Sequence, residues 1–190
     1  MTTPADILAF WFADGPDTFR EAWFKRDDGF DAAIRDRFGV ATQAARDGAI
    51  DDWAAQPDSA LALLIVLDQF PRNLHRGSAE AFASDARARA IARDVVLAHR
   101  FDLALTPSER VFAYLPFEHS EAMADQDVSV ALFEGLRDDA RMAKADGTID
   151  YAWRHRAVIA RFGRFPHRNA ALGRESTAAE QAWLAAGGGF

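Results

Sequence analysis

Apolar residues recur along the chain at helical spacing. One apolar stripe runs through residues 61–65, another through 132–140 and another through 158–162, and each repeats with the period of an amphipathic helix. No alternating apolar and polar run flanks an Asn-Gly or Asp-Gly turn, so no β-hairpin is expected. The pattern predicts an all-α fold. Its helices are expected near residues 4–13, 18–26, 28–48, 58–70, 79–100, 107–115, 120–144, 150–164 and 177–186.

Capping signals mark several of the predicted helix starts. In Thr3-Pro4-Ala5-Asp6 and Thr106-Pro107-Ser108-Glu109, threonine can cap the helix, proline fits its first position, and the acid can reach back to the cap. Thr177-Ala178-Ala179-Glu180 repeats the box without proline. Pro71 and Pro116 are expected to end helices, because proline donates no backbone hydrogen bond. Without a long linker, the chain is expected to form a single domain over residues 1–190, built from antiparallel helical hairpins in a compact array.

The composition narrows the class of protein. The chain has 190 residues, no cysteine and a formal net charge of −7. Lack of cysteine excludes disulfides, thiolate metal sites and cysteine nucleophiles, and a surplus of acids disfavours nucleic-acid binding. No apolar run approaches the roughly 20 residues of a membrane span, and the first residues do not resemble a signal peptide. We therefore expect a cytoplasmic protein that binds neither nucleic acid nor membrane.

Charge is unevenly divided along the second half of the chain. Residues 118–150 hold nine acids against Arg137, Arg141 and Lys144, whereas residues 151–174 hold six arginines and no acid. Either neighbouring helices pair these charges where they pack, or the arginines form an anion-binding groove.

Several polar residues fall on the apolar faces of predicted helices. His155 and Asp68 lie at helical spacing from the apolar stripes of their own helices, as do Asp125, Gln126 and Ser129. A buried carboxylate needs a partner, and an arginine from residues 151–174 is the expected partner of Asp68. Apolar cavities with a few placed polar groups are typical of binding sites. This pattern therefore predicts a polar pocket.

The segment Pro116-Phe117-Glu118-His119-Ser120-Glu121 concentrates ionisable groups at a predicted helix junction. His119 beside carboxylates has the elements of a general acid or base. Alternatively, Ser120 caps the next helix, Glu121 interacts with the helix dipole, and His119 lies at the surface. A mixed metal site is a further alternative that the spacing does not favour, because no His-Glu-x-x-His or Glu-x-x-His motif occurs. It would draw on Glu118, His119, Glu121, His155 and His167.

Two proline-containing segments, which we call the first and second corner, have similar sequences. Phe70-Pro71-Arg72-Asn73 with Arg76-Gly77 is similar to Phe165-Pro166-His167-Arg168-Asn169 with Gly173-Arg174. The similarity indicates either two related halves or a chance likeness between helix ends. Both corners, together with the segment 116–121, resemble motifs of the mainly bacterial family known as domain of unknown function 924, and the likeness extends from Phe10 to about Glu180. The resemblance implies a helical array similar to tetratricopeptide repeats, and it implies no reaction, cofactor or catalytic residue. The chain has no regular 34-residue period, which argues against an ordinary peptide groove.

These patterns leave two functional hypotheses. The first is a pocket that binds a small anionic molecule or acts on it by acid–base chemistry; the second is a protein- or peptide-binding scaffold whose motifs serve structure. We predict no metal and no cofactor, and the sequence does not decide whether the chain is an enzyme or which protein it binds. The predicted catalytic residues are His119, His155, Glu118 and Asp68, the anion-binding residues are Arg161, Arg164 and Arg168, and further pocket residues are Arg72, Asn73, Glu121, Gln126, His167 and Asn169.

Overall fold

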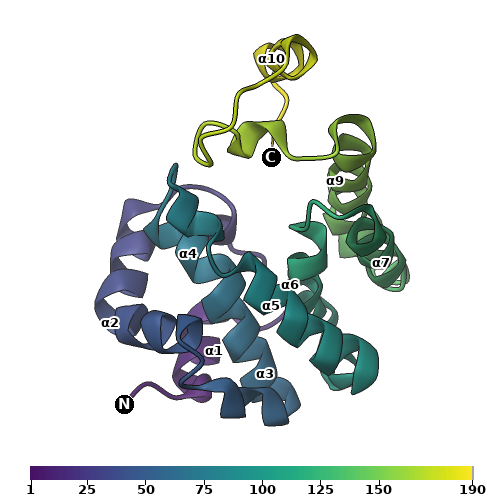
Figure 1. Cartoon of the computed structure of the whole chain (residues 1–190). Helices are drawn as coiled ribbons and strands as arrows, with labels where there is room; N and C mark the ends of the chain where they lie inside the picture. Colours follow the sequence, from purple (N-terminus) through teal and green to yellow (C-terminus); the bar gives the residue numbers. More distant parts are fainter. Residues whose placement is uncertain (190) are drawn as a thin grey trace. The chain divides into compact units, whose positions relative to one another are not determined.

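The computed structural model describes residues 1–189, and the regular secondary structure in that range is helical without strands (Figure 1). The all-α prediction is therefore confirmed. The chain divides into two compact units. Unit 1 comprises Met1–Arg76 and Glu80–Pro116, and unit 2 comprises Gly77–Ala79 and the residues from Phe117 onward.

Unit 1 is built around the helices of the first half of the chain. Short 3₁₀ turns connect them at η1 (Glu21–Trp23), η2 (Asp51–Ala55), all but the first residue of η4 (Ala79–Phe82), and η6 (Phe101–Ala104). Its α-helices are α1 (Pro4–Trp11), α2 (Asp28–Arg46), α3 (Pro57–Leu64), α4 (Phe70–Leu74), α5 (Asp85–Ala92) and all but the end of α6 (Pro107–Glu118).

Aromatic side chains fill the core of unit 1. Trp11 is fully buried, and its ring centroid lies 5.4 Å from that of Phe112, 5.5 Å from Phe30 and 5.7 Å from Phe70. The indole nitrogen of Trp23 donates to the carbonyl of Trp11 at 3.0 Å. Burial of large rings from α1, α2, α4 and α6 holds these helices together, since each ring removes a large apolar area from water.

A π-helical turn, η3 (Ile65–Gln69), joins α3 to α4 without a break in the helix. Its wider winding lets the backbone N–H of Phe70 reach the carbonyl of Ile65. Pro71 cannot donate to the carbonyl of Leu67, four residues earlier, and the hydroxyl of Ser84 donates to that carbonyl instead, at 2.7 Å. The predicted helix end at Pro71 is therefore wrong, because another segment supplies the missing donor. A second π-helical turn, η5 (Arg93–Ala98), extends α5.

Unit 2 contains α7 (Met123–Glu134), α8 (Ala140–Ala143), α9 (Thr148–Phe162), the 3₁₀ turn η7 (Pro166–Arg168) and α10 (Ala178–Ala185). Helices α7 and α9 pack side by side (Figure 1). The buried residues Val158, Ile159 and Phe165 form an apolar cluster that Phe162 and Trp183 extend. The same stripe that predicted α9 thus forms part of the core of this unit.

The helix starts agree with the sequence better than the helix ends do. The capping boxes at Thr3 and Thr177 form as predicted, and the Thr106 backbone N–H donates to Glu109 at 2.8 Å. The helix expected over residues 120–144 is broken between α7 and α8, and the one expected over 18–26 is reduced to the turn η1. Pro116 lies inside α6, which ends at Glu118.

Within the described range, no helix is long and apolar enough to span a bilayer.

Candidate functional site

The candidate site in unit 2 begins where α6 ends. The side-chain amide of Gln126, from α7, donates to the carbonyls of Glu118 and Ser120, both at 2.7 Å. The hydroxyl of Ser120 donates to Asp125 at 2.7 Å and accepts the N–H of Ala122 at 3.1 Å. These bonds satisfy carbonyls that a helix end leaves open. They also fix the bend that carries Glu118 and His119.

A buried carboxylate and imidazole meet at this bend. Oε1 of Glu118 lies 3.2 Å from Nδ1 of His155 on α9, and the two side chains are 5% and 8% exposed. The same Nδ1 lies 2.9 Å from the carbonyl oxygen of Tyr151. Because a backbone carbonyl only accepts hydrogen bonds, Nδ1 carries the proton. In the neutral imidazole the lone pair is then on Nε2.

Burial sets the protonation state of His155. It holds the pKa of His155 well below the usual value of 6.5, and nearby His119 and Arg168 act in the same direction against the carbonyl of Tyr151. The pKa of His167 is lowered to about 4, by partial desolvation first and then by Arg168. Both imidazoles are therefore neutral at neutral pH.

Edge-to-face ring contacts and a guanidinium complete the group of residues around His155. The ring centroid of His119 lies 6.3 Å and that of Phe165 5.5 Å from the centroid of His155. The guanidinium carbon of Arg168 lies 4.5 Å from the centroid of Phe165, and its Nη1 donates to the carbonyl of His119 at 3.0 Å. Arg168 is 6% exposed, so a buried positive charge lies beside the imidazoles.

Two further polar atoms lie in the interior of this unit. Gln126 and Ser129 are fully buried, and Asp125 and His155 of the same unit are buried too, as helical spacing predicted. Oε1 of Gln126 and Oγ of Ser129 have no hydrogen-bond partner among residues 1–189.

Other predicted anion-binding arginines face carboxylates or solvent. Arg164 donates twice to Glu180, at 2.7 and 2.8 Å, and this lowers the pKa of Glu180 to about 2. Arg161 is exposed and stacks on Phe162, with its guanidinium carbon 4.7 Å from the ring centroid. Arg164 is therefore committed to an internal ion pair, whereas Arg161 faces solvent.

Charge pairing accounts for much of the uneven charge distribution. Arg156 pairs with Asp127 at 2.7 Å, Arg154 pairs with Asp150 at 2.8 Å, and Arg174 pairs with Glu121 at 2.7 Å. The acidic and basic segments of the sequence thus pair at several points. Of these pairs, Arg156 with Asp127 joins two packed helices, α9 and α7, as the first of the two interpretations predicted, whereas Arg154 and Asp150 pair within α9.

The predicted site residues of unit 1 form their own network. Asp68 is fully buried and accepts from Gln69 at 2.5 Å, and Nη1 of Arg72 lies 3.5 Å from its carboxylate. Arg72 also donates twice to Asp85, both at 3.0 Å. The expected partner of Asp68 was an arginine from residues 151–174, but Arg72, four residues along the same helix, contacts it.

The family model described as "Bacterial protein of unknown function (DUF924)" matches residues 7–188. The chain belongs to the DUF924 family. A solved structure of a protein of unknown function from Agrobacterium tumefaciens is 41% identical, with a TM-score of 0.84 over 95% of this chain and 96% of that one. A search of curated proteins found no match. The family resemblance is confirmed, while the tetratricopeptide-like arrangement stays a prediction.

Each corner motif of this DUF924 protein holds a carboxylate through hydrogen bonds from its arginine, an arrangement that we call a carboxylate clasp. At the first corner, Asn73 donates to Asp31 at 2.7 Å, and Arg76 donates to it at 2.8 and 3.0 Å. At the second, Arg174 donates to Glu121 at 2.7 and 3.0 Å. Asn169 supports that arginine by accepting from its Nε at 2.9 Å.

Burial raises the pKa of Glu121, but Arg174 and the N–H of Phe165 outweigh it and hold that pKa below its usual value.

Arg76 and Arg174 belong to the two corner motifs, but the sequence predicted no role for either. Their carboxylate partners could not be predicted from local spacing, because both partners are distant in sequence. Among residues 1–189, no group of three or more histidine, cysteine or acidic side chains is placed to hold a metal ion.

Proposed function

We propose that this DUF924 protein binds a small anionic molecule beside Glu118 and His155 and acts on it by acid–base chemistry. The observation that carries the proposal is the buried contact of 3.2 Å between this carboxylate and Nδ1 of the imidazole. Burying two ionisable groups is costly, and shifted pKa values in buried clusters are frequent at functional sites. A purely structural pair would be served as well by apolar side chains.

The proposed roles follow from hydrogen bonding. Glu118 and the carbonyl of Tyr151 orient the ring of His155 through Nδ1, which makes Nε2 the nitrogen that takes a proton from the bound molecule. His119 is the second candidate for proton transfer. Arg168 supplies positive charge close to both imidazoles, and this favours an anionic ligand.

Other predicted residues enter the proposal in lesser roles. Arg161 is exposed and would contact the ligand from the surface, whereas Glu121, Arg164 and Asn169 brace the segment around Phe165. Asp68 stays a predicted acid–base group from unit 1. We infer a cytoplasmic location from the cysteine-free composition.

A ligand screen tests the proposal. Anionic metabolites and divalent cations would be added to the full chain and the melting temperature measured, because a ligand at a hundredfold its dissociation constant adds about 2.7 kcal/mol of stability. An anionic hit should stabilise the wild-type chain and His99→Gln, and should stabilise Arg168→Gln and His155→Gln much less. If no anion shifts the wild-type melting temperature, or if His155→Gln responds fully, the proposal is wrong.

A scaffold that binds another protein is the second candidate. Phe19 and Phe24 are 66% and 51% exposed, and their rings stack at 6.0 Å in unit 1. Exposed aromatic pairs are typical of binding surfaces. The carboxylate clasps at both corners also suit motifs that serve structure. Binding of a partner that is lost in Phe19→Ser with Phe24→Ser, but kept in His155→Gln, would favour this candidate.

A further inference from the structure

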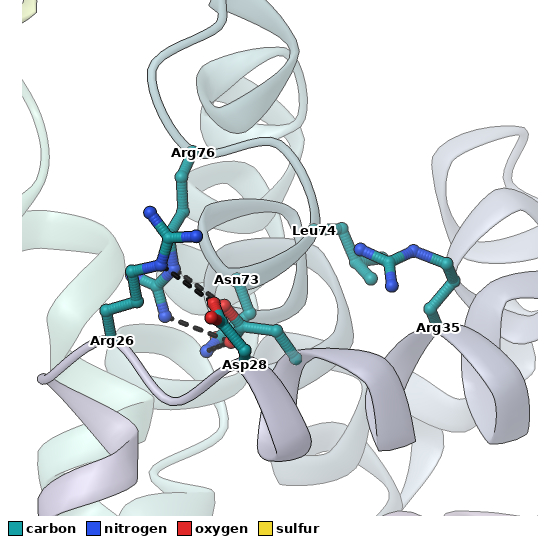
Figure 2. Close-up of a pocket in the computed structure, with 7 residues that line it drawn as sticks. Arg26, Asp28, Arg35, Asn73, Leu74 and Arg76 are labelled. Carbon is teal, nitrogen blue, oxygen red and sulfur yellow. Dashed lines mark hydrogen bonds and ion pairs between the residues drawn. The ribbon is translucent and has the colours of Figure 1, made fainter.

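A polar groove of about 410 Å³ lies in unit 1, outside the site proposed for Glu118 and His155. It is lined by the start of α2, by the end of α4 and by the segments that flank them (Figure 2). Arg26 and Arg76 lie together on one side, and Arg35 lies on the other side beside Leu74. The volume falls in the range of small-molecule sites, roughly 300 to 1,000 Å³.

The buried carboxylate in the groove is already paired with an arginine. Asp31 is 6% exposed and accepts hydrogen bonds from Asn73 and from two nitrogens of Arg76. Burial raises the pKa of Asp31, but these bonds outweigh it and keep the pKa below the usual value. Asp31 therefore stays an anion that holds Arg76 in place.

Guanidinium donors remain available around this fixed carboxylate. Nη1 of Arg76 makes no hydrogen bond with any residue of 1–189, and Arg26 uses only its Nε, to Asp28 at 2.8 Å. Arg35 makes no hydrogen bond or ion pair within the same range. Three arginines against Asp28 and Asp31 also leave the lining with net positive charge, although the chain as a whole carries −7.

We propose that this groove binds a small molecule through a phosphate or carboxylate group held by Arg35 together with Arg26 and Arg76. Planar guanidinium groups match both oxyanions with paired hydrogen bonds. The predominantly charged lining, with Leu74 as its apolar member, selects a hydrophilic ligand. The site uses no residue of the Glu118 and His155 group, so it stands independently of the function proposed there.

Binding of inorganic phosphate and of succinate to the full chain tests this proposal and separates the two oxyanions. Each probe would be titrated at constant ionic strength, with affinity measured by calorimetry and the location by backbone amide shifts. We expect saturable binding of at least one probe, with shifts at residues 26–35 and 73–76. Arg35→Gln should weaken it about tenfold, the effect of losing one charge-assisted interaction.

Arg37→Gln is the matched control, because it removes the same charge from the same helix. Two residues turn a helix by about 200°, so Arg37 faces away from Arg35, and its guanidinium stacks on Phe10 and Phe38. This control should bind like the wild type. The proposal is overturned if neither probe binds, or if Arg35→Gln binds as tightly as Arg37→Gln. Binding that Arg35→Gln leaves intact and Arg168→Gln abolishes would overturn this groove while supporting the site in unit 2.

Discussion

At the scale of single residues, the structure is notable for ionisable groups held inside the units. Helical spacing predicted that His155 and Asp68 face inward, and both are buried. Their partners were harder to predict. Glu118 reaches His155 from the end of a different helix, and such a contact depends on how helices pack. Arg72 could have been predicted as the partner of Asp68 from the sequence, because residues four apart share a helix face.

His155 should make the stability of the protein depend on pH. Its pKa is lowered in the folded chain, so below about pH 6.5 the unfolded chain binds a proton that the folded chain does not. Stability from this group is therefore present above pH 6.5 and is lost as the pH falls toward the folded pKa. The loss approaches about 1.4 kcal/mol per pH unit.

The measurement is urea unfolding at pH 7.5 and pH 5. His155→Gln should reduce the difference in unfolding free energy between the two, while exposed His99→Gln should not. His167 has a lowered pKa of about 4, so the unfolding free energy of both variants should still fall as the pH falls. An unchanged difference in His155→Gln would contradict this account.

Arg72→Ala should be among the most destabilising single substitutions in unit 1. It leaves fully buried Asp68 and largely buried Asp85 without this counter-charge. Removing one partner from a buried ion pair typically costs about 3 to 5 kcal/mol. Chemical denaturation measures the loss, and Arg35→Gln, an exposed change, should stay within about 0.5 kcal/mol of the wild type. Equal stability of Arg72→Ala and the wild type would show that the network does not stabilise the fold.

At the scale of elements, local signals predicted where helices start. Hydrogen bonds from segments distant in sequence decided where a helix continues. A capping box needs only residues close in sequence, so those at Thr3 and Thr177 could be predicted. The continuation through Pro71 could not, because it depends on a π-helical turn and on the hydroxyl of Ser84 from another segment. The single helix predicted over residues 120–144 failed because the apolar stripe continues across the break between α7 and α8.

Ser84→Ala tests this account of the continuous helix. Ser84 is buried and makes no capping hydrogen bond to α5, so its loss acts mainly on the carbonyl of Leu67. A buried carbonyl left without a donor costs about 1 to 3 kcal/mol, and denaturant unfolding should show that loss. Ser84→Thr keeps the hydroxyl and should recover most of the stability. If alanine is tolerated without loss, another donor must serve Leu67.

At the scale of the whole molecule, the boundary between the units falls inside one helix. Helix α6 carries Phe112 into the aromatic core of unit 1, while the carbonyl of Glu118 at its end is bound by Gln126 of unit 2. Unfolding either unit would remove support from this shared helix. We therefore propose that the two units unfold together, as the single domain predicted from the sequence would.

Native-state hydrogen exchange checks this proposal. The slowest amides of α2 in unit 1 and of α9 in unit 2 should open with the same free energy, equal to that of global unfolding. Fluorescence of a Trp153→Phe, Trp183→Phe variant, which reports unit 1 through its remaining tryptophans, should share its urea midpoint with circular dichroism of the same variant. Separate midpoints would show that the units unfold independently.

The carboxylate clasps at Asp31 and Glu121 have a consequence for behaviour in heat. Hydration of charged groups carries a strongly negative entropy, so withdrawing these ions from water costs less as the temperature rises. Stabilisation by apolar burial levels off over the same range. Paired ions such as Arg76 with Asp31 and Arg174 with Glu121 therefore account for a growing share of the remaining stability as the protein approaches its melting temperature.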